Sequence, residues 1–325
     1  MSLFSHKTYT VNNIETVELI SENTVLKIAV NIGNTLFSLK RNGREILYFP
    51  FSLEEYKSSD KLAGNPFMHP WANRLEGDHI TIEGKKHVFP NQLNRLIYRD
   101  GNGLPLHGLL LKTDKWRTER IEITESFVYH HAVLDFIEED WLQIFPFRHS
   151  LDMKTYLHED EICIEVGVYN MEEKPMPLSF GFHPYFIIDP EKTTELELTI
   201  PLKNVLDVDD KMIPTGSVQP KENTWPFENN TITLGKQNFD HGFTGSSIKS
   251  FFHLKQGGNE FDIYMDDEYD YAQVYAPNKP GKPYVCIEPM LAPTNALNTN
   301  SCPVLGPGEY VTEEFTISFY DEQFK

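Results

Sequence analysis

The stretch LFSLKRNGREILYF, residues 36–49, alternates apolar and polar residues on both sides of Asn42-Gly43. An alternation of period two is typical of a β-strand with one buried face. Asn-Gly is a strong signal for a two-residue turn, because both residues accept the positive φ angles that such a turn needs. The stretch therefore predicts a β-hairpin.

Strand-like segments recur along the whole chain. Residues 80–89 repeat the hairpin pattern, with Glu83-Gly84 at the turn. Later segments are short, rich in aromatic and β-branched residues, and bounded by Gly, Pro, Asn or Asp; among them are 148–157, 161–170 and 284–289. No long segment keeps a helical period, although residues 52–62 predict one or two turns of helix. Many strands with little helix predict an all-β sandwich or barrel.

The chain shows no sign of division into domains. It has no fixed-period repeat and no low-complexity tract, and the loop PNKPGKP (277–283) is too short to separate two domains. All-β folds often reach this length as single units. We therefore expect one β-sandwich domain over residues 1–325.

The charge balance limits the classes of partner. Lys and Arg number 29 against 48 Asp and Glu, which gives a formal net charge of −19. Such an acidic surface repels phosphate backbones and anionic lipids, so we expect neither nucleic acid nor membrane as a partner. No apolar stretch approaches the roughly 18 residues of a membrane span.

The N-terminus and the cysteines favour a cytoplasmic location. The first residues contain no basic region followed by an apolar run, so no secretory signal is predicted. The cysteines Cys163, Cys286 and Cys302 have no CxxC spacing, and two of them lie in apolar, strand-like segments. Free thiols in a reducing compartment are the expected state.

Five polar residues stand out because apolar residues, Pro or Gly surround them: Arg74, His107, His183, Asp240 and Glu288. His183 lies in SFGFHPYF (179–186), where Pro184 has no backbone N–H, so a central strand cannot run straight through. Glu288 follows the apolar run YVCI, and we expect Pro289 to end that strand. A carboxylate in such a position is seldom buried without a partner. We therefore hypothesise that His183 and Glu288 share the rim of one cleft.

Each of the five also has a purely structural interpretation. Arg74 could pair with a nearby carboxylate on a surface loop, where such a pair contributes little. His107 and His183 could be core histidines bonded to the backbone. Asp240 could support a turn before Gly242, as aspartate often does. The order of the motifs along the chain decides between these readings.

That order resembles the aldose 1-epimerase (galactose mutarotase) family, from about Gly33 to the C-terminus. The resemblance is carried by five motifs: NRLEGDHITIEGKKHVFPN (73–91), His107-Gly108, His183-Pro184-Tyr185-Phe186, Phe239-Asp240-His241-Gly242-Phe243 and Cys286-Ile287-Glu288. It implies a large antiparallel β-sandwich of the galactose mutarotase type, a supersandwich, that binds a small-molecule sugar in an open cleft on one sheet. A monomer or homodimer is expected.

The resemblance also implies a reaction, the interconversion of the α and β anomers of an aldohexose. This reaction needs no cofactor and no metal, because a base can take the proton of the anomeric hydroxyl while an acid protonates the ring oxygen. By resemblance, Glu288 is the base and His183 is the acid, on opposite sides of the sugar. His107 is expected at the ring oxygen or a neighbouring hydroxyl, with Arg74 and Asp240 binding hydroxyls.

The chain departs from the galactose enzymes after Glu288. The family often has glutamine two residues later, followed by Pro-Asp and an asparagine, whereas this chain has Met290 and then Pro293-Thr294-Asn295. With its short segment after His107, it is more similar to the compact bacterial members, which include hexose-6-phosphate epimerases. The general chemistry is compatible with these changes, but a preference for galactose is not implied.

Three alternatives remain open. A hexose-6-phosphate epimerase would need a basic phosphate cradle, for which Arg95 and Arg99 are the candidates. A sugar-binding or sensing protein would use the cleft without catalysis, although binding alone does not require an acid–base pair. A metal site would combine His69 with His107, His183 and Glu288, but only the fold could assemble it, since no ligand spacing such as HExxH is present.

Overall fold

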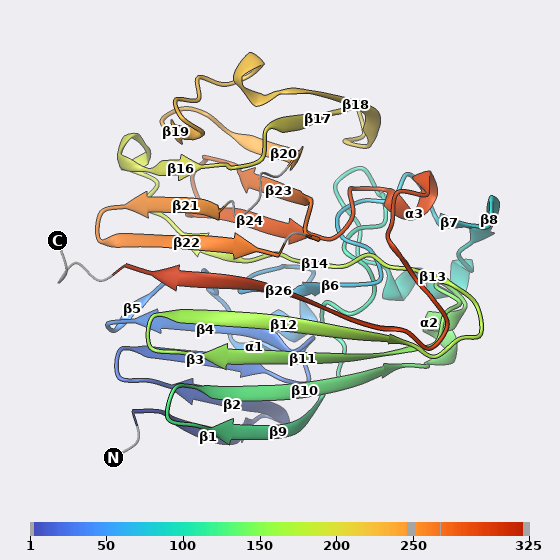
Figure 1. Cartoon of the computed structure of the whole chain (residues 1–325), viewed down its shortest axis with the longest axis horizontal. Helices are drawn as coiled ribbons and strands as arrows, with labels where there is room; N and C mark the ends of the chain where they lie inside the picture. The colour runs from blue at the N-terminus through green and yellow to red at the C-terminus, as the bar shows by residue number, and fades with distance from the viewer. Residues whose placement is uncertain (1–2, 246–250, 267, 321–325) are drawn as a thin grey trace.

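The computed structural model describes residues 3–245, 251–266 and 268–320. A nine-stranded sheet forms one layer (Figure 1). Its strands, in spatial order, are β19 (Thr231–Thr233), β16 (Glu197–Thr199), β21 (Phe251–Gln256), β22 (Asn259–Met265), β26 (Tyr310–Phe319), β12 (Glu161–Asn170), β11 (His149–Leu157), β10 (Val128–Phe136) and β9 (Arg117–Ile123).

Two further sheets lie behind it in Figure 1, one behind each half. The five-stranded sheet has the order β1 (Ser5–Val11), β2 (Ile14–Ile20), β3 (Thr24–Ala29), β4 (Thr35–Arg41) and β5 (Arg44–Glu45). The eight-stranded sheet has the order β18 (Pro214–Pro220), β17 (Asn204–Val208), β20 (Phe239–Thr244), β23 (Tyr271–Ala276), β24 (Tyr284–Met290), β14 (Gly181–Phe182) and β6 (Phe67–Met68), with β15 (Tyr185–Ile187) also on β24.

The remaining elements are short. Two-stranded sheets are formed by β7 (His79–Ile82) with β8 (Lys85–Val88) and by β13 (Met176–Pro177) with β25 (Val304–Leu305). The helices are α1 (Leu53–Ser58), α2 (Glu139–Leu142), α3 (Ala296–Thr299) and three 3₁₀ turns at Asn91–Leu96, Thr193–Glu195 and Lys221–Asn223. Among the described residues, none of these helices is long and apolar enough to cross a membrane.

The hairpin predicted over residues 36–49 is present, but its second strand is short. Lys40 pairs with Glu45 across a turn in which Asn42 has φ 51° and Gly43 has φ 76°. After β5 the chain leaves the five-stranded sheet and joins β15, where the Tyr48 N–H donates to Tyr185 O. This crossing connects the five-stranded and eight-stranded sheets. The second hairpin, β7–β8, has its predicted turn at residues 83–84.

The helical turn predicted within residues 52–62 is α1. Its first turn carries a capping box, in which the Ser52 hydroxyl accepts from the Glu55 N–H and the Glu55 carboxylate accepts from the Ser52 N–H. This exchange satisfies two backbone donors that would otherwise have no partner. Tyr56 is the buried residue that attaches α1 to the sheet.

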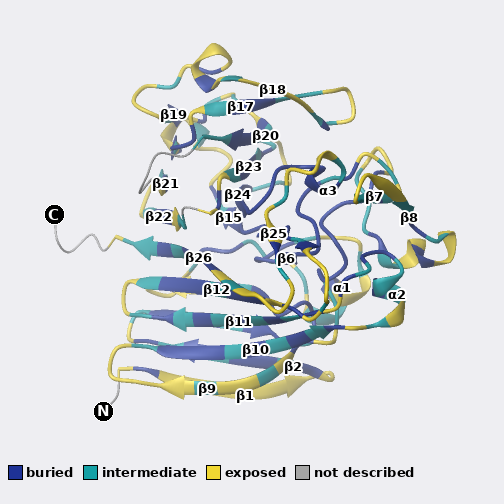
Figure 2. Ribbon diagram, turned by 45° about the vertical axis from the view of Figure 1, so that its right-hand side comes forward, coloured by how far each residue is buried: buried dark blue, intermediate teal, exposed yellow. Residues whose placement is uncertain are grey.

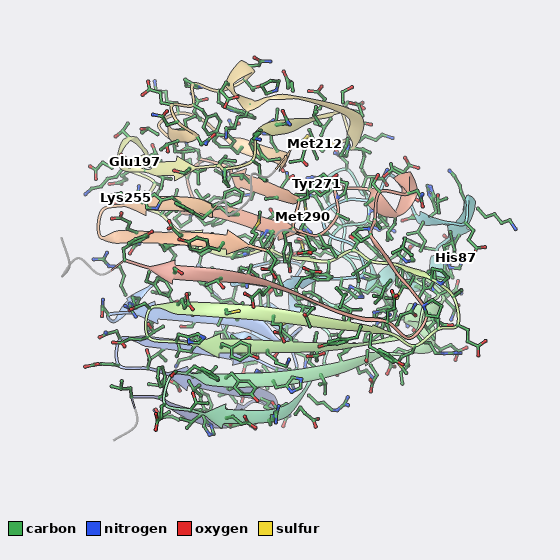
Figure 3. The ribbon with its side chains drawn as sticks, viewed as in Figure 1. His87, Glu197, Met212, Lys255, Tyr271 and Met290 are labelled. Atoms are coloured by element: carbon green, nitrogen blue, oxygen red, sulfur yellow. The ribbon has the colours of Figure 1, made fainter. Side chains whose placement is uncertain are left out.

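The expectation that Pro289 ends its strand is wrong. β24 runs through Glu288 and Pro289 to Met290, and Met290 pairs with Tyr271 of β23 (Figure 3). The N–H of Leu291 donates to Phe180, so by alternation the nitrogen of Pro289 faces the same side. On that side the neighbouring chain is interrupted between β14 and β15, at His183 and Pro184. Because Gly181 pairs with Met290, Pro289 lies opposite Phe182, the last residue of β14, where the pairing on this side breaks off.

One hydrophobic core fills the space between the layers. Its main cluster runs from Phe4 to Ile317 and draws buried side chains from all three large sheets. Figure 2 shows this interior as buried, while β1 and most of β9 lie exposed at one edge of the molecule. Cys163 and Cys286 are buried free thiols, and Cys302 is partly exposed.

Candidate active site

All five residues singled out from the sequence line one cleft of about 590 Å³. Asp240 lies on β20, Glu288 lies on β24, and His183 occupies the break between β14 and β15. Arg74 and His107 come from two loop segments that bridge to each other through Arg74 and Leu106. The cleft therefore opens over the eight-stranded sheet.

His183 and Glu288 touch each other at the base of the cleft. The distance from His183 Nε2 to Glu288 Oε1 is 3.2 Å, and both side chains are buried. The His183 ring stacks on Tyr185, with ring centroids 4.5 Å apart and planes inclined by 7°. The structure thus brings the two strand positions to one place. It places the two groups side by side, whereas the sequence led us to expect them on opposite sides of a ligand.

Burial sets the charge state of this pair. Burial raises the pKa of Glu288 well above its usual value, and the nearby Asp240 raises it further, while Arg74 opposes this. Burial lowers the pKa of His183 to about 3. Removing charges from water favours the neutral forms of both groups, a carboxylic acid and an uncharged imidazole. In these forms Glu288 Oε1 and His183 Nε2 are close enough to share one proton.

His107 is fixed in one tautomer by a backbone hydrogen bond. Its Nδ1 accepts the Asn73 N–H at 3.2 Å, and burial lowers its pKa well below the usual value. Because Nδ1 is an acceptor in the neutral ring, the proton is on Nε2. His107 therefore offers an N–H donor to the cleft. Its ring lies edge-on to His183, with centroids 5.1 Å apart.

This tautomer argues against the metal site that the sequence left open. His107, His183 and Glu288 have potential ligand atoms within 4.8 Å of one another. A protonated Nε2 on His107 has no lone pair for a cation, and its Nδ1 lone pair is already used. His69 does not join these residues, because its Nε2 lies 2.7 Å from Nε2 of the buried His149. The arrangement suits proton transfer better than metal binding.

Arg74 and Asp240 are held by neighbours that the sequence did not indicate. Arg74 Nε donates to the nearly buried Asp100 at 2.8 Å, and its guanidinium lies 3.6 Å from Asp240. Asp240 also accepts from Gln273 Nε2 at 2.8 Å. Asp100 and Gln273 had no sequence signal beyond being polar, since each acquires its role from a partner distant in the chain. Arg74 does not form the surface pair considered above.

Tyrosines form a second group in the cleft, and of these sequence reasoning did not single out Tyr48, Tyr98, Tyr275 or Tyr284. The side chains of Tyr48, Tyr98, Tyr185, Tyr275 and Tyr284 line the cleft. Neighbouring rings contact each other, with 5.0 Å between the centroids of Tyr185 and Tyr284. Such rings offer flat apolar faces together with hydroxyl groups, which suits a polyhydroxylated ligand. Tyr185, Tyr275 and Tyr284 lie on three different strands while Tyr48 and Tyr98 lie outside strands, so the five share no pattern in the sequence.

The basic cradle proposed for a phosphate does not assemble. Arg95 lines a different cavity and pairs with Asp140. Arg99 does reach the cleft, but its guanidinium is bound to Asp78 at 2.8 Å and to the Gly103 carbonyl at 2.7 Å. These contacts neutralise Arg99, so the two arginines cannot act together on one phosphate.

The fold and the cleft define an all-β protein with a buried histidine–carboxylate pair under a polar, tyrosine-lined opening. The family model described as "Aldose 1-epimerase" matches residues 15–318. The chain thus belongs to the aldose 1-epimerase family. It is 22% identical over 231 residues to the uncharacterized protein YihR of Escherichia coli K12, a match that covers 71% of this chain and 70% of that protein.

Solved structures show the same fold. A galactose mutarotase-like protein from Clostridium acetobutylicum superimposes with a TM-score of 0.84 at 19% identity, covering 98% of this chain and 99% of that one. A galactose 1-epimerase from Lactobacillus acidophilus superimposes with a TM-score of 0.77 at 17% identity, covering 98% of both chains. The chain has the galactose mutarotase-like fold, as its sequence motifs implied.

Proposed function

We propose that the protein is an aldose 1-epimerase that interconverts the α and β anomers of an aldohexose. The observation that carries this proposal is the contact between His183 Nε2 and Glu288 Oε1, 3.2 Å apart in the cleft. Binding a sugar does not require an acid and a base side by side, whereas anomer exchange uses one of each. This contact favours catalysis over a sensing role.

The reaction moves one proton to the substrate and one from it. The shared proton first moves from Glu288 to His183, so that the pair reacts as a carboxylate and an imidazolium. Glu288 then takes the proton of the hydroxyl on C1, and His183 delivers its proton to the ring oxygen. The electron pair left on the C1 oxygen forms the carbonyl, and the bond between C1 and the ring oxygen breaks. Rotation about the C1–C2 bond and reversal of these steps give the other anomer. Since both oxygens are bonded to C1, an acid and a base that lie next to each other can serve them.

The other cleft residues support the ring-opened state. The Nε2–H of His107 donates to the ring oxygen or to a neighbouring hydroxyl, where negative charge develops as the ring opens. Arg74, held between Asp100 and Asp240, donates to hydroxyls and stabilises the same charge. Asp240 accepts from a sugar hydroxyl. Arg74 and Arg99 are each paired with carboxylates, so neither is free to hold a phosphate, and an uncharged aldohexose is the substrate we propose.

Polarimetry with freshly dissolved α-anomers of several aldohexoses tests the proposal. Glu288→Gln and His183→Asn remove the base and the acid with little change in volume, and each should slow mutarotation roughly 100-fold or more. Circular dichroism and unfolding temperature establish that the variants are folded. Folded variants that retain nearly the full rate would refute these roles.

A comparison of ligands separates the remaining readings. Glucose and glucose 6-phosphate are offered to the same preparation, and we expect faster turnover of the uncharged sugar. A sugar that binds tightly but mutarotates only at the background rate would instead identify a sensing protein.

A further inference from the structure

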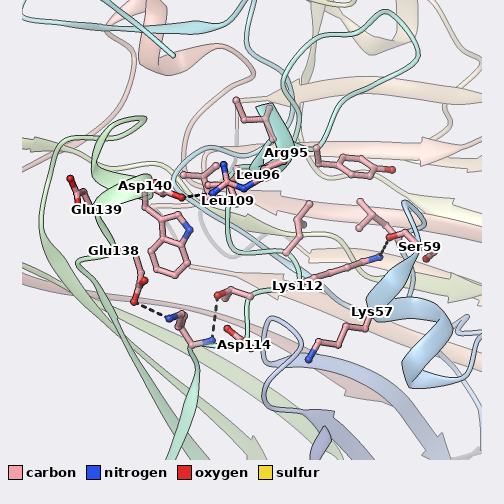
Figure 4. Close-up of a pocket in the computed structure, with 18 residues that line it drawn as sticks. Lys57, Ser59, Arg95, Leu96, Leu109, Lys112, Asp114, Glu138, Glu139 and Asp140 are labelled. Atoms are coloured by element: carbon pink, nitrogen blue, oxygen red, sulfur yellow. Dashed lines mark hydrogen bonds and ion pairs between the residues drawn. The ribbon is translucent and has the colours of Figure 1, made fainter. Parts of the chain in front are cut away.

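A second cavity of about 650 Å³ lies next to the cleft and shares Leu62 and Tyr98 with it (Figure 4). Its wall includes Lys112, a partly buried lysine in an acidic protein. Unlike Arg95 and Lys115, which pair with carboxylates in this cavity, Lys112 points its amine at backbone carbonyls. The function proposed above makes no use of it.

Lys112 ties down the segment that follows α1. Its Nζ donates to the carbonyl of Tyr56 at 2.6 Å and to that of Ser59 at 2.8 Å, and Figure 4 shows the second of these contacts. The amine also lies 4.1 Å from the centroid of the buried Tyr56 ring. Hydrogen bonds from a charged donor are stronger than neutral ones, and the ring face adds to the attraction. Burial lowers the pKa of Lys112 to about 8.

The segment held in this way is a wall of the cleft. Asp60, Lys61 and Leu62 line the cleft directly after Ser59. From Gly64 onward the chain is fixed to the strands that flank the acid–base pair. Gly64 O accepts the Tyr185 N–H at 2.9 Å, and Pro66 O accepts the His183 N–H at 3.1 Å. The Asp60–Leu62 wall is therefore held on its N-terminal side by Lys112 and on its C-terminal side by the strands next to His183.

Lys112 itself belongs to a rigid segment that also carries His107. The Leu109 N–H donates to His69 O at 2.7 Å, and the Gly33 N–H donates to Thr113 O at 2.8 Å. The approach at Gly33 is so close that an added Cβ would lie 2.2 Å from Leu111 O. Lys112 thus connects the cleft wall to the segment that presents His107.

We propose that Lys112 is a positioning residue that fixes the Asp60–Leu62 wall relative to His107 and so sets the affinity for the sugar. The proposal rests on the function proposed above. It separates two tasks: Lys112 governs how well a sugar is held, while His183 and Glu288 govern proton transfer. Lys112 is not catalytic, because its amine donates to the backbone of its own chain.

Replacement of Lys112 by methionine tests this division. Lys112→Met keeps the apolar stem and removes the donors, so KM should rise about 5- to 10-fold while kcat and its pH profile stay within about twofold. Lys57→Met is the matched control. Lys57 lines the same cavity, but its amine makes no hydrogen bond or ion pair within residues 3–245, 251–266 and 268–320. Lys112→Arg, which supplies several donors, should restore much of the affinity.

Two measurements keep the proposal testable without catalysis. Hydrogen exchange should be faster at residues 59–62 in Lys112→Met than in the wild type or Lys57→Met, and calorimetric titration should show weaker sugar binding. Unchanged exchange would refute the tether, and faster exchange with unchanged KM and Kd would reduce it to a structural contact. A wild-type protein without mutarotase activity would refute the proposed function, while exchange and binding would still decide the role of Lys112.

Discussion

Burial changes the pKa values of His183 and Glu288 and so sets the protonation state of the pair. In water, a glutamate and a histidine ionise at different pH values and act independently near neutrality. In the cleft the pKa of Glu288 is raised and that of His183 is lowered to about 3, so the order is reversed. The neutral pair contains the same number of protons as a carboxylate facing an imidazolium. Both forms belong to one macroscopic protonation state.

This reversal predicts an unusual pH profile. Below the raised pKa of Glu288 and above about 3, where His183 gains a second proton, the pair keeps its single proton. We therefore expect kcat/KM to stay level from above about pH 3 up to the raised pKa of Glu288, with no step from His183 at the usual histidine pKa. It should fall at higher pH, when the shared proton is lost. Polarimetric rates across the pH range check this.

As a control, circular dichroism at each pH establishes that the protein stays folded, so that a fall in rate does not report unfolding. An NMR titration in which the His183 ring gains its proton at the usual histidine pKa would mean that His183 titrates freely and that the shared-proton description is wrong.

At the scale of single residues, the sequence indicated the site residues that combine an ionisable side chain with an unusual local backbone pattern. His183 stood out because Pro184 interrupts its strand, and Glu288 stood out because a carboxylate follows an apolar run. Asp100 and Gln273 could not be found, because what they do depends on Arg74 and Asp240 reaching them from other parts of the chain. Tautomers are likewise invisible in a sequence, since the Asn73 N–H that fixes His107 is 34 residues away.

At the scale of elements, the turn that carries His107 depends on close backbone contact. Gly108 has φ +76°, and an added Cβ would lie 2.1 Å from the carbonyl oxygen of His69. Gly84, in the β7–β8 turn, has nearly the same φ, +75°, but nothing lies within 4 Å of an added Cβ. Substitutions at the two glycines can therefore separate the free-energy cost of a side chain at positive φ from the added cost of a clash with the backbone of His69.

This pair gives a matched experiment. Gly84→Ala should destabilise the protein by about 1 kcal/mol, the cost of a left-handed residue with a side chain. Gly108→Ala should cost about 2 kcal/mol more, since backbone must move, and should also slow mutarotation by displacing His107. Urea unfolding and polarimetry measure the two effects. Equal destabilisation by both variants would show that the His69 contact is unimportant.

Local pattern predicted the elements well and their ends less well. The turns at Asn42-Gly43 and Glu83-Gly84 are where the sequence indicated, because a two-residue turn is decided by its own residues. The end of β24 was misplaced. Pro289 lies at the last paired position before the break between β14 and β15, and β24 continues because its other side stays paired with β23.

At the scale of the whole molecule, one continuous core predicts one cooperative unit. Leu26 of β3 and Leu254 of β21 lie in different halves of the molecule but belong to the same buried cluster. Leu26→Ala and Leu254→Ala should each cost about 2–5 kcal/mol and lower the temperature of the same single transition. Differential scanning calorimetry checks this by comparing calorimetric and van't Hoff enthalpies. Two separate transitions, each shifted by only one variant, would indicate two domains.

The position of Glu288 on β24 has a consequence for how proteins of this kind diversify. β24 is paired with strands on both sides, so substitutions elsewhere have little freedom to move its side chains. Another part of the cleft lining, residues 60–62, is a short loop between two anchors. If the protein has the function proposed above, mutation of residues 60–62 can change sugar selection without disturbing the acid–base pair. A new substrate preference can evolve on this scaffold without the acid–base pair being built again.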